Sequence, residues 1–124
     1  MAHSGRRLSK EEALIGDKIL TALYDWTAGC GYRRNYPSYE ALADDFHVSR
    51  EQLGWFFSEI LGVKFLTFRK RQRLAYAAFL LRTDAVMPTA AAGQEAGIAD
   101  KSDFRRQFTE VFKTPPEQWR TSSM

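Results

Sequence analysis

The chain has 124 residues, 44% of them hydrophobic and 27% charged, which predicts one soluble globular domain without room for a separate ligand-sensing domain. No apolar run approaches the roughly 20 residues that span a bilayer, and residues 1–7 lack the apolar stretch of a secretion signal. The single cysteine excludes an internal disulfide, and with only two distant histidines beside it a zinc site is implausible. The net charge of +3 is too small to indicate a nucleic-acid binder by count alone, and we expect a cytoplasmic protein without a cofactor or metal.

The first expected helix covers residues 10–28, and Gly29 and Gly31 end it. Its apolar positions recur at helical spacing and are Ile15, Ile19, Ala22, Leu23 and Trp26. Residues 30–37 have the composition of a loop. Ser38 is then a suitable N-cap for a short helix over Tyr39–Phe46.

A turn over residues 47–49 leads into a further expected helix over Arg50–Leu61, which Gly62 ends. Ser49 and Gln52 fit a capping box at its start. The side chains expected to face inward are Leu53, Phe56, Phe57, Ile60 and Leu61.

A longer helix is predicted over residues 65–83, with Leu74, Ala77, Ala78 and Leu81 at core spacing. Pro88 is expected in the first turn of a short helix over Thr89–Ala96. After a turn at residues 97–99, Asp100 caps a helix over Lys101–Phe112, and residues 116–120 add a closing turn. The side chains of the 101–112 helix expected to face inward are Phe104, Phe108, Val111 and Phe112.

Two segments of the chain repeat each other. The residues Phe57-Ser58-Glu59-Ile60-Leu61 return 51 positions later as Phe108-Thr109-Glu110-Val111-Phe112, each time at the end of a helix–turn–helix pattern. No stretch alternates as a strand does. The sequence therefore predicts an all-α fold of about seven helices, in which two helix–turn–helix subdomains (residues 10–64 and 84–120) flank a linking helix (65–83), with tails at 1–9 and 121–124.

From about Ile15 to Arg120 the chain resembles the DNA-binding domain of the AraC/XylS family of bacterial transcription regulators. In the first subdomain the residues that match the family pattern are Leu42-Ala43, Val48-Ser49 and Leu53. In the linking helix the matching residues are Phe65, Phe68, Arg73-Leu74, Ala77 and Leu80-Leu81. The second subdomain contributes Gly97-Ile98, Asp100, Ser102, Phe104, Arg106, Phe108, Phe112 and the ending Thr114-Pro115-Pro116-Glu117-Gln118-Trp119-Arg120.

Three positions depart from the family pattern. His47 and Lys113 stand where glycine is usual, and the turn at His47 needs near left-handed geometry. Gly93 replaces a small alanine, and a glycine inside a helix costs roughly 1 kcal/mol. We expect the support helix around Gly93 to be the least stable part of the fold.

In a helix–turn–helix the second helix lies in the major groove and meets base edges. For the second subdomain the outward residues are Lys101, Ser102, Arg105, Arg106 and Thr109, and the resemblance implies that they contact DNA rather than form a plain solvated face. Arginine and lysine can pair with guanine, and serine and threonine can serve bases or phosphates.

The outward set of the first subdomain is Arg50, Glu51, Gly54, Trp55 and Ser58. Trp55 could pack on a thymine methyl group and Glu51 could accept from cytosine, or Trp55 could fold back against Phe56 or the long loop as a satellite of the core. Gly54 offers no side chain, and would only allow the helix backbone to approach DNA closely. We therefore expect guanine readout mainly from the second subdomain, and shape and apolar contact from the first.

The remaining cations have two readings. Four cations, Arg69, Lys70, Arg71 and Arg73, are expected on the outer side of the linking helix, where they either clamp phosphates or confer solubility. Arg73 also matches the arginine of the family, and the alternative for this residue is that it braces the two halves. For Arg33 and Arg34 in the loop, phosphate binding and simple solvation are likewise both open. Cys30 is read as a spare thiol.

The resemblance implies a sequence-specific transcription regulator that inserts two recognition helices into adjacent major grooves of double-stranded DNA, and it implies no enzyme. The expected partners are DNA, RNA polymerase and a sensor or dimerisation domain that this chain lacks, with no membrane partner. The alternative is a helical protein-interaction module of the same fold with little specific DNA binding. The target sequence, the regulated genes and the sign of regulation are not encoded in any pattern we find.

Overall fold

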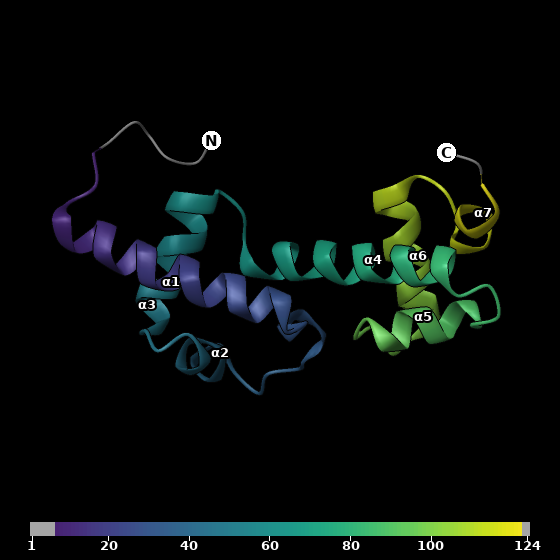
Figure 1. Ribbon diagram of the computed structural model, residues 1–124, viewed down its shortest axis with the longest axis horizontal. Helices are drawn as coiled ribbons and strands as arrows, with labels where there is room; N and C mark the ends of the chain where they lie inside the picture. Colours follow the sequence, from purple (N-terminus) through teal and green to yellow (C-terminus); the bar gives the residue numbers. More distant parts are fainter. Residues whose placement is uncertain (1–6, 123–124) are drawn as a thin grey trace. The chain divides into compact units, whose positions relative to one another are not determined.

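The computed structural model describes residues 7–122, and no strand occurs among them. Seven α-helices within this range (Figure 1) confirm the all-α prediction. They are α1 (Lys10–Ala28), α2 (Tyr39–Asp45), α3 (Arg50–Trp55), α4 (Phe65–Thr83), α5 (Thr89–Glu95), α6 (Lys101–Phe112) and α7 (Pro116–Thr121). A 3-10 turn η1 (Gly31–Arg33) follows α1, and a π-helical segment η2 (Phe56–Leu61) continues α3. The expected tails, residues 1–9 and 121–124, lie partly outside the described residues. The same holds for most of residues 1–7, in which no secretion signal was expected.

Side-chain caps fix where several helices begin. Ser38 accepts a hydrogen bond from the Ala41 N–H, and Ser49 forms the predicted capping box with Gln52. Asp100 accepts from the Asp103 N–H at 2.8 Å. The three caps predicted from the sequence are thus confirmed. Each cap satisfies a backbone N–H group that the first turn of the helix leaves without a partner. Pro88 is the N-cap of α5 and not part of its first turn, since its backbone is extended.

The chain divides into two compact units, and the division falls after Phe68, inside α4. The first unit is built on α1, whose buried face places Trp26 between Phe46 and Phe65, with ring centroids 5.9 and 5.8 Å away. The buried side chains of this core also include Ile19, Leu23, Leu42, Leu53, Phe56 and Phe57. The helix α3 therefore rests on an aromatic core through its inner face.

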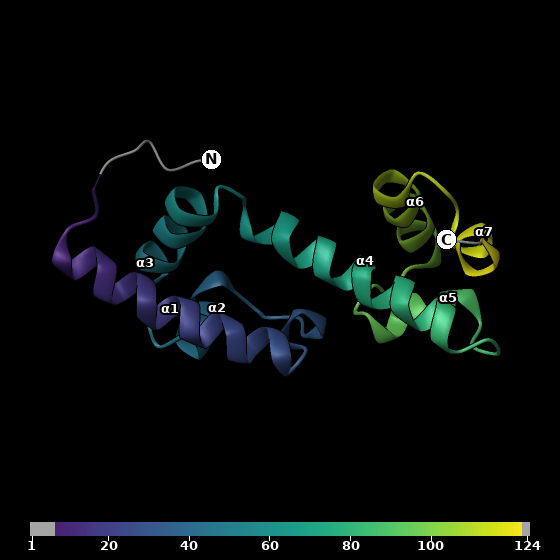
Figure 2. The same cartoon turned by 45° about the horizontal axis from the view of Figure 1, so that its top comes forward.

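The second unit packs α5, α6 and α7 around the C-terminal part of α4, as two views show (Figures 1 and 2). Its core consists of Leu74, Ala77, Ala78, Leu81, Ala92, Ala96, Ile98, Phe104 and Phe108. The helix α7 is held by Trp119, whose indole N–H donates to the Ala78 carbonyl at 3.1 Å, and by Arg120, which donates to the Leu81 carbonyl at 3.2 Å. These bonds fix the position of α7 beside α6.

Among residues 7–122, three residues other than glycine have left-handed backbone: Cys30 in the loop after α1, and His47 and Lys113 in two further turns. His47 has φ 58° in the turn between α2 and α3, as the sequence predicts, and Lys113 has φ 61° at the end of α6. A side chain in this region costs energy relative to glycine. The turns are nevertheless tied down, because the Lys113 N–H donates to the Thr109 carbonyl at 2.8 Å and the His47 carbonyl accepts from Lys18 at 2.7 Å.

Three predicted orientations are wrong. Leu61 is 37% exposed, because η2 bonds each residue to the fifth before it and so turns Leu61 away from the buried side. Val111 is 39% exposed, since Phe112 fills the adjoining site by packing on Trp119 at 4.8 Å. Arg73 is buried at 8% exposure, whereas it was expected on the outer side of the linking helix.

Candidate nucleic-acid interface

The second helix–turn–helix is held together by the fit between α5 and α6. A Cβ built on Gly93 would stand 2.6 Å from the Phe104 ring, so the glycine lets α6 approach its support closely. The turn is closed by the Ile98 N–H, which donates to the Gly93 carbonyl at 2.8 Å, and by Gly97 at φ 99°. The position of α6 on α5 is therefore fixed by packing and by the turn.

The sequence-predicted residues of the second unit all lie on α6. Lys101, Ser102, Arg105 and Arg106 are exposed, and Thr109 is partly exposed with its hydroxyl donating to the Arg105 carbonyl at 2.8 Å. A shallow surface hollow is lined by four of these residues together with a carboxylate: Ser102, Arg105, Arg106, Thr109 and Glu110. The face thus combines two guanidinium groups with hydroxyl groups, which suits base edges and phosphates.

Carboxylates that the sequence reasoning missed surround this face. Arg105 pairs with Glu117 of α7, Arg106 with Asp103 at 3.1 Å, and Lys70 of α4 with Glu110 at 3.6 Å. The side chains of the two arginine pairs are more than half exposed, so each pair contributes at most about 1 kcal/mol and phosphates can displace it. Only the register of α7 against α6 reveals Glu117 as a partner, and no spacing in the sequence shows it.

Glu117 has a lowered pKa. Burial by itself would raise the pKa of this carboxyl, but a backbone N–H bond and the hydrogen bond and charge of Arg105 outweigh burial. The carboxylate is therefore ionised at neutral pH and neutralises the charge of Arg105.

In the first unit Arg50, Glu51 and Ser58 are exposed, while Gly54 is partly buried. Arg50 pairs with Glu40 of α2 at 2.8 Å, a contact within the helix–turn–helix. The Ser58 hydroxyl donates to the Trp55 carbonyl at 3.4 Å. The face has fewer exposed cations than that of the second unit, since Arg50 is the single arginine or lysine on α3.

Trp55 was expected in the outward set of the first unit, but its side chain does not project freely into solvent. It is partly buried, and its ring tip lies 3.9 Å from the position of a Cβ on Gly16 of α1. Its indole nitrogen is shielded from solvent and has no hydrogen-bond partner among the described residues. The ring thus folds back, but against α1 instead of Phe56 or the loop that the alternative reading named.

The cations of the linking helix are not equivalent. Arg71 is exposed, whereas Arg69 and Lys70 are partly buried. Burial, and then the charge of Arg69, lower the pKa of Arg73 to about 10. Arg73 therefore belongs to the packed part of α4. In the loop, Arg34 is exposed and lies 3.5 Å from Asp45, while Arg33 is partly buried.

Cys30 lies in the loop after α1 with left-handed backbone at φ 57°, and its sulfur accepts from the Tyr32 hydroxyl at 3.5 Å. Among residues 7–122 no group of three or more histidine, cysteine or carboxylate side chains is placed to hold a metal ion. No helix in that range is both long and apolar enough to cross a membrane.

Residues 42–122, about two thirds of the chain, match a family model described as "Helix-turn-helix domain". The match begins inside α2 and runs past the end of α7, so it includes both α3 and α6. The chain belongs to this helix–turn–helix family, of AraC type. It thus carries a DNA-binding domain of the kind found in transcription regulators, and the family is not one of enzymes.

Curated relatives of the AraC-type domain include the arabinose operon regulatory proteins of Salmonella typhimurium and Escherichia coli, each 31% identical over 80 residues. Those residues are 64% of this chain but 28% and 27% of the two relatives, so the match covers less than a third of their length. A similar solved structure is the C-terminal domain of AraT, a response regulator from Geobacillus stearothermophilus. It is 21% identical, with a TM-score of 0.73 over 96% of this chain and 90% of that one, and supports the fold.

Proposed function

We propose that the chain is a sequence-specific DNA-binding transcription regulator that inserts α3 and α6 into adjacent major grooves. The observation that carries the proposal is the face of α6, where four exposed side chains able to donate hydrogen bonds lie on a helix fixed by its cap and its support. A recognition helix needs this combination, because misplaced donors cannot discriminate between bases.

The site residues of the proposal are those predicted from sequence. On α6 they are Lys101, Ser102, Arg105, Arg106 and Thr109, and in the first unit they are Arg50, Glu51, Trp55 and Ser58. Arg105 and Arg106 would pair with guanine or phosphate. Because the indole nitrogen of Trp55 is buried, we assign to this partly buried residue an apolar contact.

Two recognition helices about 34 Å apart would meet consecutive major grooves on one face of the duplex, so one chain would protect an asymmetric site of about 20 base pairs. As further partners we propose RNA polymerase and a sensor or dimerisation domain, because the curated relatives are more than three times as long as the matched segment. The proposed location is the cytoplasm, on the chromosome.

A titration of the purified chain with double-stranded DNA over a range of salt concentrations tests the proposal. Each phosphate contact adds about 0.9 to the slope of log K against log salt, so a groove-binding domain gives a steep slope and prefers its own site at about 150 mM salt. The helical protein-interaction module predicts weak binding without sequence preference, and that result would refute the proposal.

A further inference from the structure

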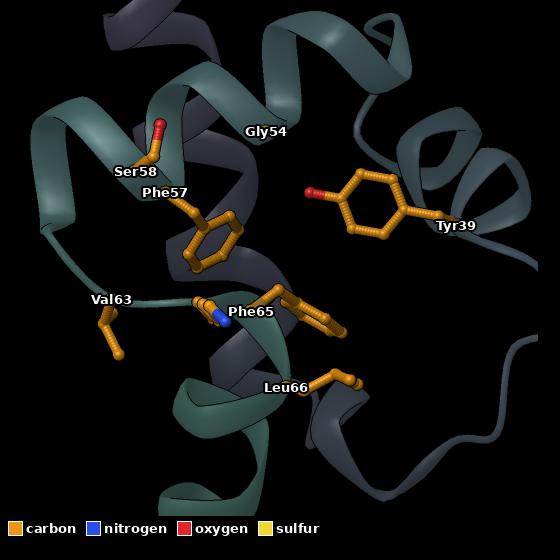
Figure 3. A pocket seen from close by; sticks show the side chains of 8 residues that line it. Tyr39, Gly54, Phe57, Ser58, Val63, Phe65 and Leu66 are labelled. Atoms are coloured by element: carbon orange, nitrogen blue, oxygen red, sulfur yellow. The ribbon is translucent and has the colours of Figure 1, made fainter.

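The first unit contains an apolar hollow of about 330 Å³ on the flank of its recognition element. The rings of Tyr39, Phe57 and Phe65 converge beneath Gly54, with Leu66 beside them (Figure 3). The centroid of Phe65 is 5.4 Å from that of Phe57 and 6.3 Å from that of Tyr39, so the floor is a packed aromatic cluster. Leu66 is 65% exposed at the rim.

Gly54 lines this hollow, and no packing contact with residues 7–122 requires a glycine at this position. Its backbone is helical, and a Cβ built on it would meet no atom within 4 Å. Gly31 and Gly93 differ, because a Cβ there would stand 2.3 and 2.6 Å from the rings of Trp26 and Phe104. A glycine inside a helix is less stable than alanine. The open space above Gly54 therefore points to a group from outside the chain.

The position of the hollow identifies that group. Gly54 lies on α3, which the proposed function places in the major groove, and the apolar group that base pairs display in that groove is the 5-methyl group of thymine. Lys64 also lines the hollow and supplies a positive charge for the neighbouring phosphate backbone. Trp55, the residue that the sequence suggested for thymine contact, instead packs toward Gly16.

We infer that the hollow at Gly54 receives thymine methyl groups and makes the first unit a reader of T·A pairs. The inference rests on the proposed function. It assigns apolar readout to the space beside α3, and it explains why a recognition helix with one arginine and no lysine can contribute to specificity.

The test replaces each thymine of the protected site by deoxyuridine, which removes one methyl group and leaves the hydrogen-bonding groups intact. A cleavage reagent attached to Cys30, the single cysteine of the chain, marks the half-site that the first unit covers. We expect affinity to fall about four-fold for each methyl group that the hollow buries, from the transfer free energy of one such group. Unchanged affinity at every thymine of this half-site would overturn the inference.

Variants at Gly54 test whether the hollow itself is responsible. Gly54→Ala and Gly54→Leu place a side chain in the open space above Gly54. Both should reduce the thymine-to-uracil ratio, which is the affinity for the thymine-containing site divided by that for the uracil-substituted site. Gly54→Leu should bring this ratio close to one. Gly54→Ala should be at least as thermally stable as the wild type, which separates lost readout from lost folding. Persistence of the full ratio in a folded Gly54→Leu variant would overturn the inference.

Two controls complete the design. Glu59→Leu adds the same side chain on η2 at an exposed position that does not line the hollow, and it should keep the ratio. Thymines in the other half-site should respond alike in all variants. A wild type indifferent to uracil, but binding an apolar dye such as ANS that Gly54→Leu does not bind, would assign the hollow to small apolar ligands and refute thymine readout. Loss of any protected site would instead refute the proposed function.

Discussion

The carboxylate of Glu117 on α7 accepts hydrogen bonds from the Arg105 guanidinium of α6 through both of its oxygens, at 2.5 Å each. Because α7 is anchored by Trp119 and Arg120 to backbone carbonyls of the same unit, the carboxylate is held in a fixed place. Arg105 is therefore paired with a carboxylate of another helix before DNA arrives, whereas the carboxylate partner of Arg106 is Asp103 of α6 itself.

Glu117→Gln should release Arg105 for a phosphate contact. We expect tighter binding to DNA of any sequence and a salt slope steeper by about 0.9, with a smaller ratio of specific to non-specific affinity. Fluorescence anisotropy at several salt concentrations measures all three. Glu11→Gln, an exposed position on α1, makes the same change in net charge and should leave the slope unaltered. In an Arg105→Ala background Glu117→Gln should have no effect on the slope, and an undiminished effect there would show that Glu117 acts on DNA directly.

The lowered pKa of Glu117 predicts a pH-dependent contribution to stability. A carboxyl whose pKa is lower in the folded state stabilises that state above its unfolded pKa of about 4.5, and this contribution disappears as the pH falls through the folded value. The wild type should exceed Glu117→Gln in unfolding free energy at pH 7 by less than about 1 kcal/mol, because the pair is exposed. Denaturant unfolding at pH 7 and pH 3 should show this difference closing at low pH, and a difference that persists at pH 3 would contradict the assignment.

Arg106→Ala should reduce discrimination between the specific site and its single-base variants by about 1–3 kcal/mol, the value of one bidentate guanine contact. Trp55→Ala should lower discrimination less and mainly reduce stability, by roughly 1–3 kcal/mol, since the half-buried ring packs toward α1. Competition binding and thermal unfolding on the two variants separate these effects. Equal losses of specificity would refute the division of labour between the units.

The same substitution at two helical glycines should have opposite effects on stability. Gly93→Ala forces a Cβ to within 2.6 Å of the Phe104 ring, and the resulting overpacking costs about 1–3 kcal/mol, more than the helix propensity that alanine gains. Gly54→Ala adds its Cβ to open space and should stabilise by up to about 1 kcal/mol. Urea denaturation measures both. A stabilised Gly93→Ala would mean that α6 can move away from α5.

Arg71 is the exposed cation of the linking helix and therefore the best candidate for a phosphate clamp. Arg71→Gln should reduce the salt slope by about 0.9, while Arg71→Lys, which keeps the charge, should preserve it. Salt titrations of the two variants distinguish a clamp from a residue that serves solubility. An unchanged slope in Arg71→Gln would favour solubility.

Local signals in the sequence predicted most of the fold. The bounds of α1, α4 and α6 agree with those expected, because the Asp100 cap of α6 and the apolar spacing of the three helices act within one or two turns of the chain. The π-helical segment after Trp55 was not predicted, since a fifth-residue bond leaves no distinct periodicity over one turn.

The features missed in the site depend on distant parts of the chain. Trp55 meets Gly16, 39 positions earlier, and Arg105 meets Glu117 across the α6–α7 turn. Helical spacing shows which side of a helix is apolar, but not which residue of another helix lies opposite. The close fit of Gly93 against Phe104 likewise appeared in the sequence as a weak helix position, and the structure shows it to be a packing contact.

The most direct test of the central claim is selection of genomic fragments by the purified chain at about 150 mM salt, followed by a footprint of the selected DNA. Two helix–turn–helix units that enter adjacent major grooves predict one protected, asymmetric site of about 20 base pairs. Protection of a single groove, or sequence-independent binding without a footprint, would contradict the two-groove account.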